Sequence, residues 1–144
     1  MKRVLFVCIG NACRSQMAEA FARTYGSDVM VAASAGLAPA MNVAPDTIKA
    51  MAEKGIDLRD HFPKSIRHLG RSQFDLAINM SGMELPPIPG AQGREWDVPD
   101  PVFLKYVAHC EVRDEIERMV MGLILDLRRE QGAPPPRSPA ATGS

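Results

Sequence analysis

The first apolar run of the chain predicts a buried strand. Positions 4–7 are all apolar and partly β-branched, so residues 2–8 fit a strand with both faces covered. Similar apolar runs predict further strands at 29–33 and 74–80. A short fourth strand is expected near Trp96, within a proline-rich segment that is otherwise loop.

The segments between these strands show helical spacing. The first predicted helix ends near Gly26 and places on one face Met17, Ala20, Phe21 and Thr24. A second helix starts at Pro45 and closes at Gly55. The clearest helix is the last, where apolar residues of the segment 116–127 recur at i, i+3, i+4, i+7, i+8 and i+11 with charged residues opposite. This pattern predicts a helix docked on a sheet.

The order of these elements predicts the fold class. Strands that alternate with helices indicate βαβ units and a mainly parallel sheet. The composition changes after Glu130, because residues 132–144 are rich in proline and alanine and lack the apolar residues of a core. We therefore predict one domain over residues 1–131 and a disordered tail over 132–144.

Charge and composition narrow the class of protein. The 144 residues include 17 basic and 17 acidic side chains, and this balance gives no support for a nucleic-acid binder. Three cysteines, an odd count, fit a reducing compartment better than a disulfide framework. No apolar run approaches the ~20 residues of a membrane span, and the first run is too short for a signal peptide. We expect a cytoplasmic protein without membrane or nucleic-acid partners.

The junction after the first strand holds the candidate chemistry. Residues 8–15 read Cys-Ile-Gly-Asn-Ala-Cys-Arg-Ser and follow a strand end, where open α/β sheets bind ligands. A short loop that turns into a helix directs N–H groups and positive partial charge at one point, and Arg14 adds a planar fork for a tetrahedral anion. The same field favours the thiolate of Cys8, a nucleophile suited to phosphorus. Gly10 and Asn11 tolerate the backbone conformations of such a loop. The alternative is an inert buried Cys8 with Arg14 on the surface.

Displacement at phosphorus also requires a proton donor for the leaving oxygen. Asp97 and Asp100 lie in a rigid proline-containing loop, and either carboxyl group fits that role if it reaches the site. The alternative is that both are turn aspartates, which are common beside proline.

At these residues the chain resembles the low-molecular-weight protein tyrosine phosphatase superfamily, which includes the thioredoxin-coupled arsenate reductases. The resemblance covers residues 2–130 and is carried by the opening strand, segment 8–15, Ser34-Ala35-Gly36 and Asp100-Pro101. It implies an α/β three-layer sandwich, in which a four-stranded parallel sheet has helices on both faces.

The resemblance also implies a role for each site residue. Cys8 would be the nucleophile that forms a phosphocysteine, and Asp100 would be the general acid and later the base, which leaves Asp97 as a turn residue. The supporting residues would be Asn11 and Ser34, which brace the loop, and Ser15, which assists Cys8. The anion would be bound by the loop residues Ile9, Gly10, Asn11, Ala12, Cys13 and Arg14. No cofactor is expected.

Two segments bear on the branch of the family. Residues 14–19 and 34–37 resemble the reductases, and no aromatic residue lines 37–42 as in many phosphatases. The reductase pattern, however, places two further cysteines just after the third strand, where this chain has none and Met80 stands near the first. A reductase of this kind would therefore use an external thiol donor. In some reductases an acidic residue near the position of Lys64 helps to hold a potassium ion. The ammonium of Lys64 could take the place of that ion, so no metal is expected.

The remaining cysteines and histidines have plainer interpretations. By resemblance, Cys13 can form a reversible disulfide with the nucleophile; otherwise it is a small apolar residue. Cys110, expected just before the last helix, is interpreted as packing. The three histidines lack metal-ligand spacing and are interpreted as surface or loop residues: His61, His68 and His109.

Three functions follow from the sequence. The first is a monomeric cysteine-dependent phosphatase acting on phosphomonoesters, either phosphotyrosine in a protein or a small aryl phosphate. The alternative is an arsenate reductase that uses an external thiol donor. The third is a non-catalytic oxyanion-binding or redox-sensing domain.

Overall fold

The computed structural model describes residues 1–132. The segment predicted to be a disordered tail, 132–144, lies outside the described residues except for Gly132. In chain order the elements are β1 (Lys2–Cys8), α1 (Arg14–Tyr25), β2 (Met30–Gly36), α2 (Pro45–Ala52), the 3-10 helix η1 (Ile66–Leu69), β3 (Leu76–Asn79), β4 (Gln92–Glu95) and α3 (Tyr106–Glu130).

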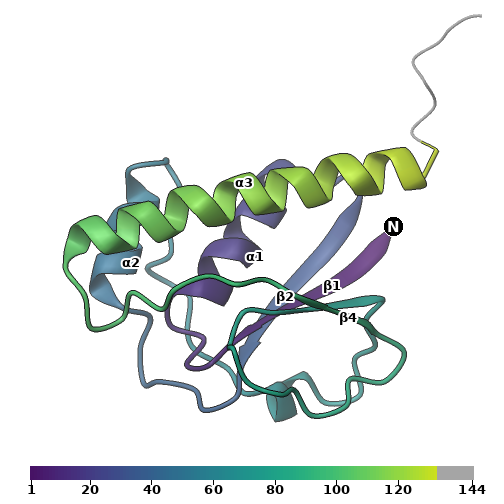
Figure 1. Ribbon diagram of the computed structural model, residues 1–144, viewed down its shortest axis with the longest axis horizontal. Helices are drawn as coiled ribbons and strands as arrows, with labels where there is room; N and C mark the ends of the chain where they lie inside the picture. The colour runs from purple at the N-terminus through teal and green to yellow at the C-terminus, as the bar shows by residue number, and fades with distance from the viewer. Residues whose placement is uncertain (133–144) are drawn as a thin grey trace, which may run out of the picture.

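The four strands form one parallel sheet in the order β2-β1-β3-β4 (Figure 1). Strand β1 is central, and Phe6 pairs with Ser34 on one side and Ile78 on the other. Strand β2 extends to Gly36, beyond the predicted end at residue 33, while β4 ends just before Trp96. Because all strands are parallel, their carboxyl ends meet at one edge, where the loops after β1, β2 and β4 come together.

The two faces of the sheet are covered by different kinds of elements, helices on one face and mainly loops on the other. Phe6 and its same-face neighbours pack against α1 and α3 in the larger core, which also contains Met51 of α2. Leu5 and Val7 point to the other face, which is covered by η1 and the adjoining loops. Figure 1 shows these three layers, with α3 along one side of the molecule and η1 on the opposite side of the sheet. The predicted α/β sandwich is confirmed.

Helix α3 starts earlier than its apolar periodicity indicates. It begins at Tyr106, so it contains both His109 and Cys110, and the prediction that Cys110 precedes the helix is wrong. His109 is 1% exposed, and its Nδ1 lies 3.0 Å from Thr47 Oγ1 on α2. The prediction of a surface or loop position for His109 is also wrong, because this hydrogen bond satisfies a polar ring inside an interhelical contact.

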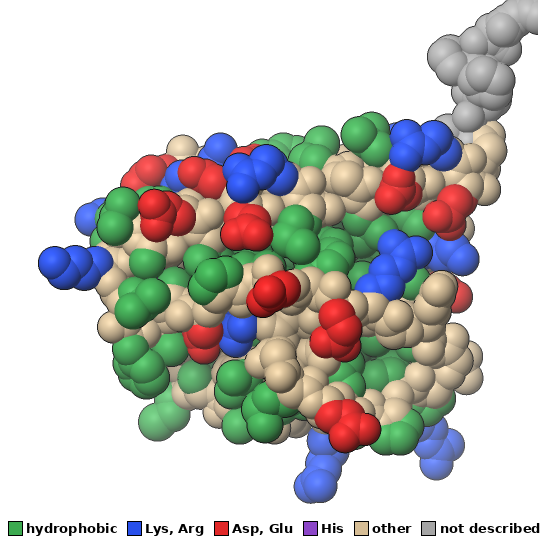
Figure 2. All heavy atoms as spheres, in the orientation of Figure 1, with side chains coloured by type: hydrophobic (Ala, Val, Ile, Leu, Met, Phe, Trp, Pro, Cys, Tyr) green, Lys and Arg blue, Asp and Glu red, His purple; other side chains and the backbone are tan. Residues whose placement is uncertain are grey.

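The surface of α3 agrees with the charge pattern of its sequence. Figure 2 shows acidic and basic side chains interspersed along this helix, with hydrophobic side chains gathered beneath it. Within residues 1–132, no helix is long and apolar enough to cross a membrane.

Candidate active site

The loop between β1 and α1 is held in place by backbone hydrogen bonds from the segment that follows β2. The carbonyl oxygens of Cys8, Ile9 and Gly10 accept hydrogen bonds of 2.8–3.1 Å; the donors are the N–H groups of Leu37, Ala38 and Ala40. Within the described residues, the N–H groups of residues 9–13 donate to no protein acceptor. Carbonyl groups on one side therefore leave the amide groups available on the other, which is the arrangement of an anion-binding loop.

Gly36 makes this close approach possible. A Cβ atom at this position would lie 2.8 Å from the carbonyl oxygen of Ile9 and 2.9 Å from the amide nitrogen of Asn11. Both are main-chain atoms, so a side chain here would displace the loop itself. The glycine of the Ser-Ala-Gly segment thus has a direct steric role at the site.

Cys8 ends β1 and is 2% exposed. Its Sγ lies 2.9 Å from Ser15 Oγ, which also accepts a hydrogen bond of 2.7 Å from Asn11 Nδ2. Because the serine oxygen already accepts from the amide, its own proton is available for the cysteine sulfur. Ser15 is therefore placed to stabilise a thiolate, as the family resemblance implies for it.

Asn11 adopts a left-handed backbone conformation, with φ of 50°. Its Oδ1 accepts hydrogen bonds from the Lys64 backbone N–H at 2.8 Å and from Gln16 Nε2 at 3.0 Å. The Asn11 side chain thus connects the loop to the segment before η1 and to Ser15, which is hydrogen-bonded to the Cys8 sulfur. Ser34, the other residue expected to brace the loop, instead donates to the buried carboxylate of Glu19.

Arg14 is anchored to the main chain of two other segments. It is 4% exposed, and its Nη1 donates to the carbonyl oxygens of Met80 and, at 3.0 Å, of Val98. Its Nη2 lies 3.3 Å from Asp100 Oδ2. The Nε of Arg14 is buried and has no hydrogen-bond partner among residues 1–132. A buried donor without an acceptor costs about 1–3 kcal/mol, so this group favours the binding of an oxyanion.

Asp100, rather than Asp97, shares a hollow with the nucleophile. The hollow has a volume of about 340 Å³ and is lined by Cys8, Ile9, Gly10, Ala12, Cys13, Arg14, Ala40, Asp100, Val102 and Phe103. The Asp100 side chain is 36% exposed at its mouth. Asp97 lines a neighbouring hollow with Trp96, which Arg14 also lines but Cys8 does not. Of the two carboxyl groups, the geometry gives Asp100 access to a reacting anion, which is the requirement for a general acid.

Cys13 lies in the same hollow, but its thiol is poorly disposed to ionise. Burial raises the pKa of Cys13 to about 12, and a hydrogen bond from Thr47 opposes this effect only in part. All three cysteines, Cys8, Cys13 and Cys110, are free. Since the thiolate is the reactive form, Cys13 is a weak candidate for attack on an adduct at the nucleophile.

One residue behind the loop, Gln16, was missed by the sequence analysis. Gln16 is fully buried, and its Nε2 donates to the carbonyl oxygens of Asn11 at 3.2 Å and Phe62 at 3.1 Å, as well as to Asn11 Oδ1. Its Oε1 lies 3.2 Å from Nδ1 of the half-buried His61. No periodic signal could reveal Gln16, because α1 is buried on every side over its first turns.

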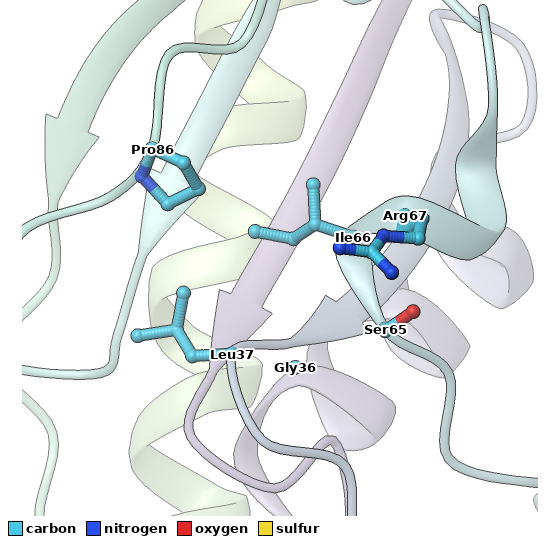
Figure 3. Close-up of a pocket in the computed structure, with 6 residues that line it drawn as sticks. All are labelled: Gly36, Leu37, Ser65, Ile66, Arg67 and Pro86. Carbon is cyan, nitrogen blue, oxygen red and sulfur yellow. The ribbon is translucent and has the colours of Figure 1, made fainter.

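A further hollow lies between the C-terminal end of β2 and the helix η1. Figure 3 shows its lining, in which Leu37, Ile66 and Pro86 surround the space and Arg67 extends from η1. It contains none of the nucleophile, Arg14 and Asp100. Within the described residues no group of three histidine, cysteine or acidic side chains is arranged to hold a metal ion.

Comparison with known proteins places this site in a family. The family model described as low molecular weight phosphotyrosine protein phosphatase matches residues 3–133. A curated protein from Synechocystis sp., named glutaredoxin arsenate reductase, is 35% identical over 128 residues, covering 86% of this chain and 97% of the relative. Arsenate reductase 1 of Bacillus cereus is 37% identical over 119 residues, covering 80% and 88%.

Solved structures agree with these matches. A structure described as an arsenate reductase in the phosphate binding state has a TM-score of 0.79 and 32% identity, and covers 88% of this chain and 99% of that protein. The YwlE arginine phosphatase of Geobacillus stearothermophilus, at 22% identity and a TM-score of 0.75, covers 93% and 97% and supports the fold alone. The chain therefore belongs to the low molecular weight phosphotyrosine protein phosphatase family.

Proposed function

We propose that the protein is an arsenate reductase that uses Cys8 as nucleophile and an external thiol as reductant. The sequence analysis placed this function second to phosphomonoester hydrolysis. The observation that carries it forward is the 35–37% identity, over most of the chain, to two relatives that are named arsenate reductases. The anion loop and the unpartnered Nε of Arg14 support binding of a tetrahedral oxyanion such as arsenate.

The first half-reaction is a displacement at arsenic. The loop amides and Arg14 bind the arsenate oxygens, and the Cys8 thiolate attacks arsenic. Asp100 donates a proton to the departing oxygen, which leaves as water. The product is a covalent adduct with a bond between sulfur and arsenic(V).

The second half-reaction transfers two electrons. A thiolate of the external donor attacks the Cys8 sulfur, and the sulfur–arsenic bond breaks with its electron pair remaining on arsenic. Arsenite leaves, and a mixed disulfide joins Cys8 to the donor. A second donor thiol then releases Cys8 and forms the oxidised disulfide of the donor. The net change is one arsenate and two thiols to one arsenite, one disulfide and water.

The positions of the three cysteines support an external thiol donor. Cys13 has a raised pKa, and Cys110 lies on α3 outside the hollow. The segment after β3, where the reductase pattern places further cysteines, has Met80 and no cysteine. A thioether cannot displace the arsenic or form a disulfide, so no internal thiol is placed for the second step.

The direct test is arsenite production with defined donors. We expect turnover with glutathione-type or mycothiol-type thiols, no turnover with thioredoxin alone, and no turnover of Cys8→Ser with any donor. Asp100→Asn should reduce kcat by about 10²-fold or more, while the matched control Asp97→Asn stays near wild type. Absence of arsenite with every donor would refute the reductase proposal.

A second candidate is hydrolysis of phosphomonoesters through the same residues. It is favoured by the grouping of Cys8, Arg14 and Asp100 around one hollow without a resolving thiol beside it. Release of phosphate from an aryl phosphate between about pH 5 and 7, lost in Cys8→Ser, would support it. Phosphate binding without turnover of either substrate would instead favour the non-catalytic oxyanion-binding domain.

A further inference from the structure

The side chain of Asn79 lies beside the backbone that anchors Arg14. Asn79 is the last residue of β3 and is 2% exposed. The chain turns directly after it, and the first carbonyl group of this turn, that of Met80, accepts a hydrogen bond from Arg14 Nη1. Neither half-reaction gives a role to the buried amide of Asn79.

Each end of this amide has partners of the matching kind. The Oδ1 of Asn79 accepts hydrogen bonds from the N–H of Ser81 at 2.9 Å and from its hydroxyl group at 2.6 Å. The Nδ2 donates to the Met83 carbonyl oxygen at 2.7 Å and lies 3.1 and 3.2 Å from the carboxylate oxygens of Glu95, the register partner of Asn79 on β4. Because the oxygen meets donors and the nitrogen meets acceptors, the amide has one orientation, in which it joins the turn to the neighbouring strand.

One peptide unit connects this amide to Arg14. Its N–H belongs to Ser81 and donates to Asn79 Oδ1, while its carbonyl group belongs to Met80 and accepts from Arg14 Nη1. A trans peptide unit is planar, so its N–H and carbonyl groups point in opposite directions. The hydrogen bond to Asn79 therefore fixes the direction in which the Met80 carbonyl group faces the guanidinium.

The second anchor of Arg14 depends on the same pair of strands. The N–H of Trp96 donates to the Asn79 carbonyl oxygen at 2.9 Å. Two residues further on, the Val98 carbonyl oxygen accepts from Arg14 Nη1 at 3.0 Å. Because both anchors hold Nη1, the Nε of Arg14, which has no partner among residues 1–132, is left to bind an anion.

We propose that Asn79 is a positioning residue, which orients the Met80 carbonyl group and through it the guanidinium of Arg14 for binding of the oxyanion. The proposal rests on the anion site of the proposed function, which arsenate reduction and phosphomonoester hydrolysis share. A guanidinium binds a tetrahedral anion through a planar fork, so a tilt of this plane weakens binding although the charge remains. Loss of the Asn79 amide should therefore lower the affinity for the anion.

The test measures the affinity for inorganic phosphate by isothermal titration calorimetry. Asn79→Leu keeps nearly the same side-chain size and removes both hydrogen-bonding ends of the amide. At a temperature where circular dichroism shows a folded protein, we expect the Kd for phosphate to rise about tenfold, the effect of about one lost hydrogen bond to a charged group. A Kd within about threefold of the wild-type value would overturn the proposal.

A double-variant comparison assigns the effect to Arg14. Arg14→Lys keeps the positive charge but has no planar fork to orient. Because residues that act through one another are not additive, Asn79→Leu should change the phosphate Kd less in this background than in the wild-type chain. An equal or larger change would overturn the proposal, since Asn79 would then act on the fold and not on the guanidinium.

The matched control lies at the other end of the same strand. Asp75 directly precedes β3, is exposed, and accepts a hydrogen bond of 2.7 Å from the N–H of Arg3. Asp75→Ala should therefore weaken the start of the strand and leave the phosphate Kd within about threefold of the wild-type value. A loss of affinity equal to that of Asn79→Leu would show a general effect of strand stability and overturn the proposal.

Asn79→Ala provides a second variant if Asn79→Leu does not fold. The smaller side chain leaves room for water at the freed polar groups, while the direct hydrogen bonds to the turn and to Glu95 are still lost. A wild-type Kd in Asn79→Ala would likewise overturn the proposal. Phosphate binding without arsenate reduction would refute the proposed function alone, because the binding measurements do not depend on turnover.

Discussion

Gly36→Ala is expected to impair the site without a change in any polar residue. The added Cβ would meet three main-chain atoms of the anion loop, in Ile9, Gly10 and Asn11, at 2.8–2.9 Å. Since real Cβ contacts of this kind lie beyond 3.0 Å, the loop must move away from β2 by several tenths of an ångström. Overpacking of this type costs about 1–3 kcal/mol of folding free energy.

The effect on activity should exceed the effect on stability. A shift of the loop displaces the N–H groups and the nucleophile relative to Arg14, which is anchored elsewhere. Misplacement of reacting groups by about 1 Å costs about 10²-fold in rate, and smaller shifts cost proportionately less. We therefore expect kcat/KM for the oxyanion substrate to fall by at least about tenfold, with a lower Tm.

The assay compares thermal unfolding and kcat/KM for wild type, Gly36→Ala and Gly122→Ala. Gly122 is exposed within α3, and a Cβ there meets no atom within 4 Å. Alanine at that position should stabilise the helix by about 0.5–1 kcal/mol and leave kcat/KM unchanged. Wild-type activity and an unchanged Tm in Gly36→Ala would refute the steric role that we assign to Gly36.

Three further variants test other parts of the structure. In aryl phosphate hydrolysis, the second candidate activity, Asp100→Asn should lower kcat most for esters with poor leaving groups, in a steady-state comparison that includes Asp97→Asn. Because burial raises the pKa of Cys13 to about 12, its thiol stays protonated at pH 8; alkylation at that pH should miss Cys13, and Cys13→Ala should retain most of the turnover. Thr47→Val removes the hydrogen-bond partner of the buried His109 ring, so urea denaturation should show a loss of about 1–3 kcal/mol.

The sequence predicted those parts of the fold that depend on local apolar order. Residues 4–7 are fully buried in β1, as their continuous apolar run indicates, and the loop that follows is the anion loop. The start of α3 was not predictable in this way, because its first turns are held by a buried polar contact of His109 rather than by an apolar stripe.

The reactive residues of the candidate site could be predicted from the sequence, but the residues that hold the loop in place could not. The spacing of Cys8 and Arg14 follows from a loop between a strand and a helix, and local sequence carries that signal. Gln16 and Lys64 support the loop through contacts with Asn11 and Phe62 that exist only once distant segments meet. The residues alone left Asp97 and Asp100 as equal candidates, and only the folded loop separates them.

The anchoring of Arg14 by the carbonyl oxygens of Met80 and Val98 has a consequence for substrate choice. Both anchoring residues belong to the buried core, so the guanidinium is oriented before any anion arrives and has little freedom to adapt to one. A rigid receptor of this kind accepts tetrahedral oxyanions of equal charge and similar size on nearly equal terms. Inorganic phosphate is then expected to compete with arsenate for entry. In the proposed reaction, discrimination arises only after binding, because arsenic(V) accepts an electron pair from the thiol and phosphorus(V) does not.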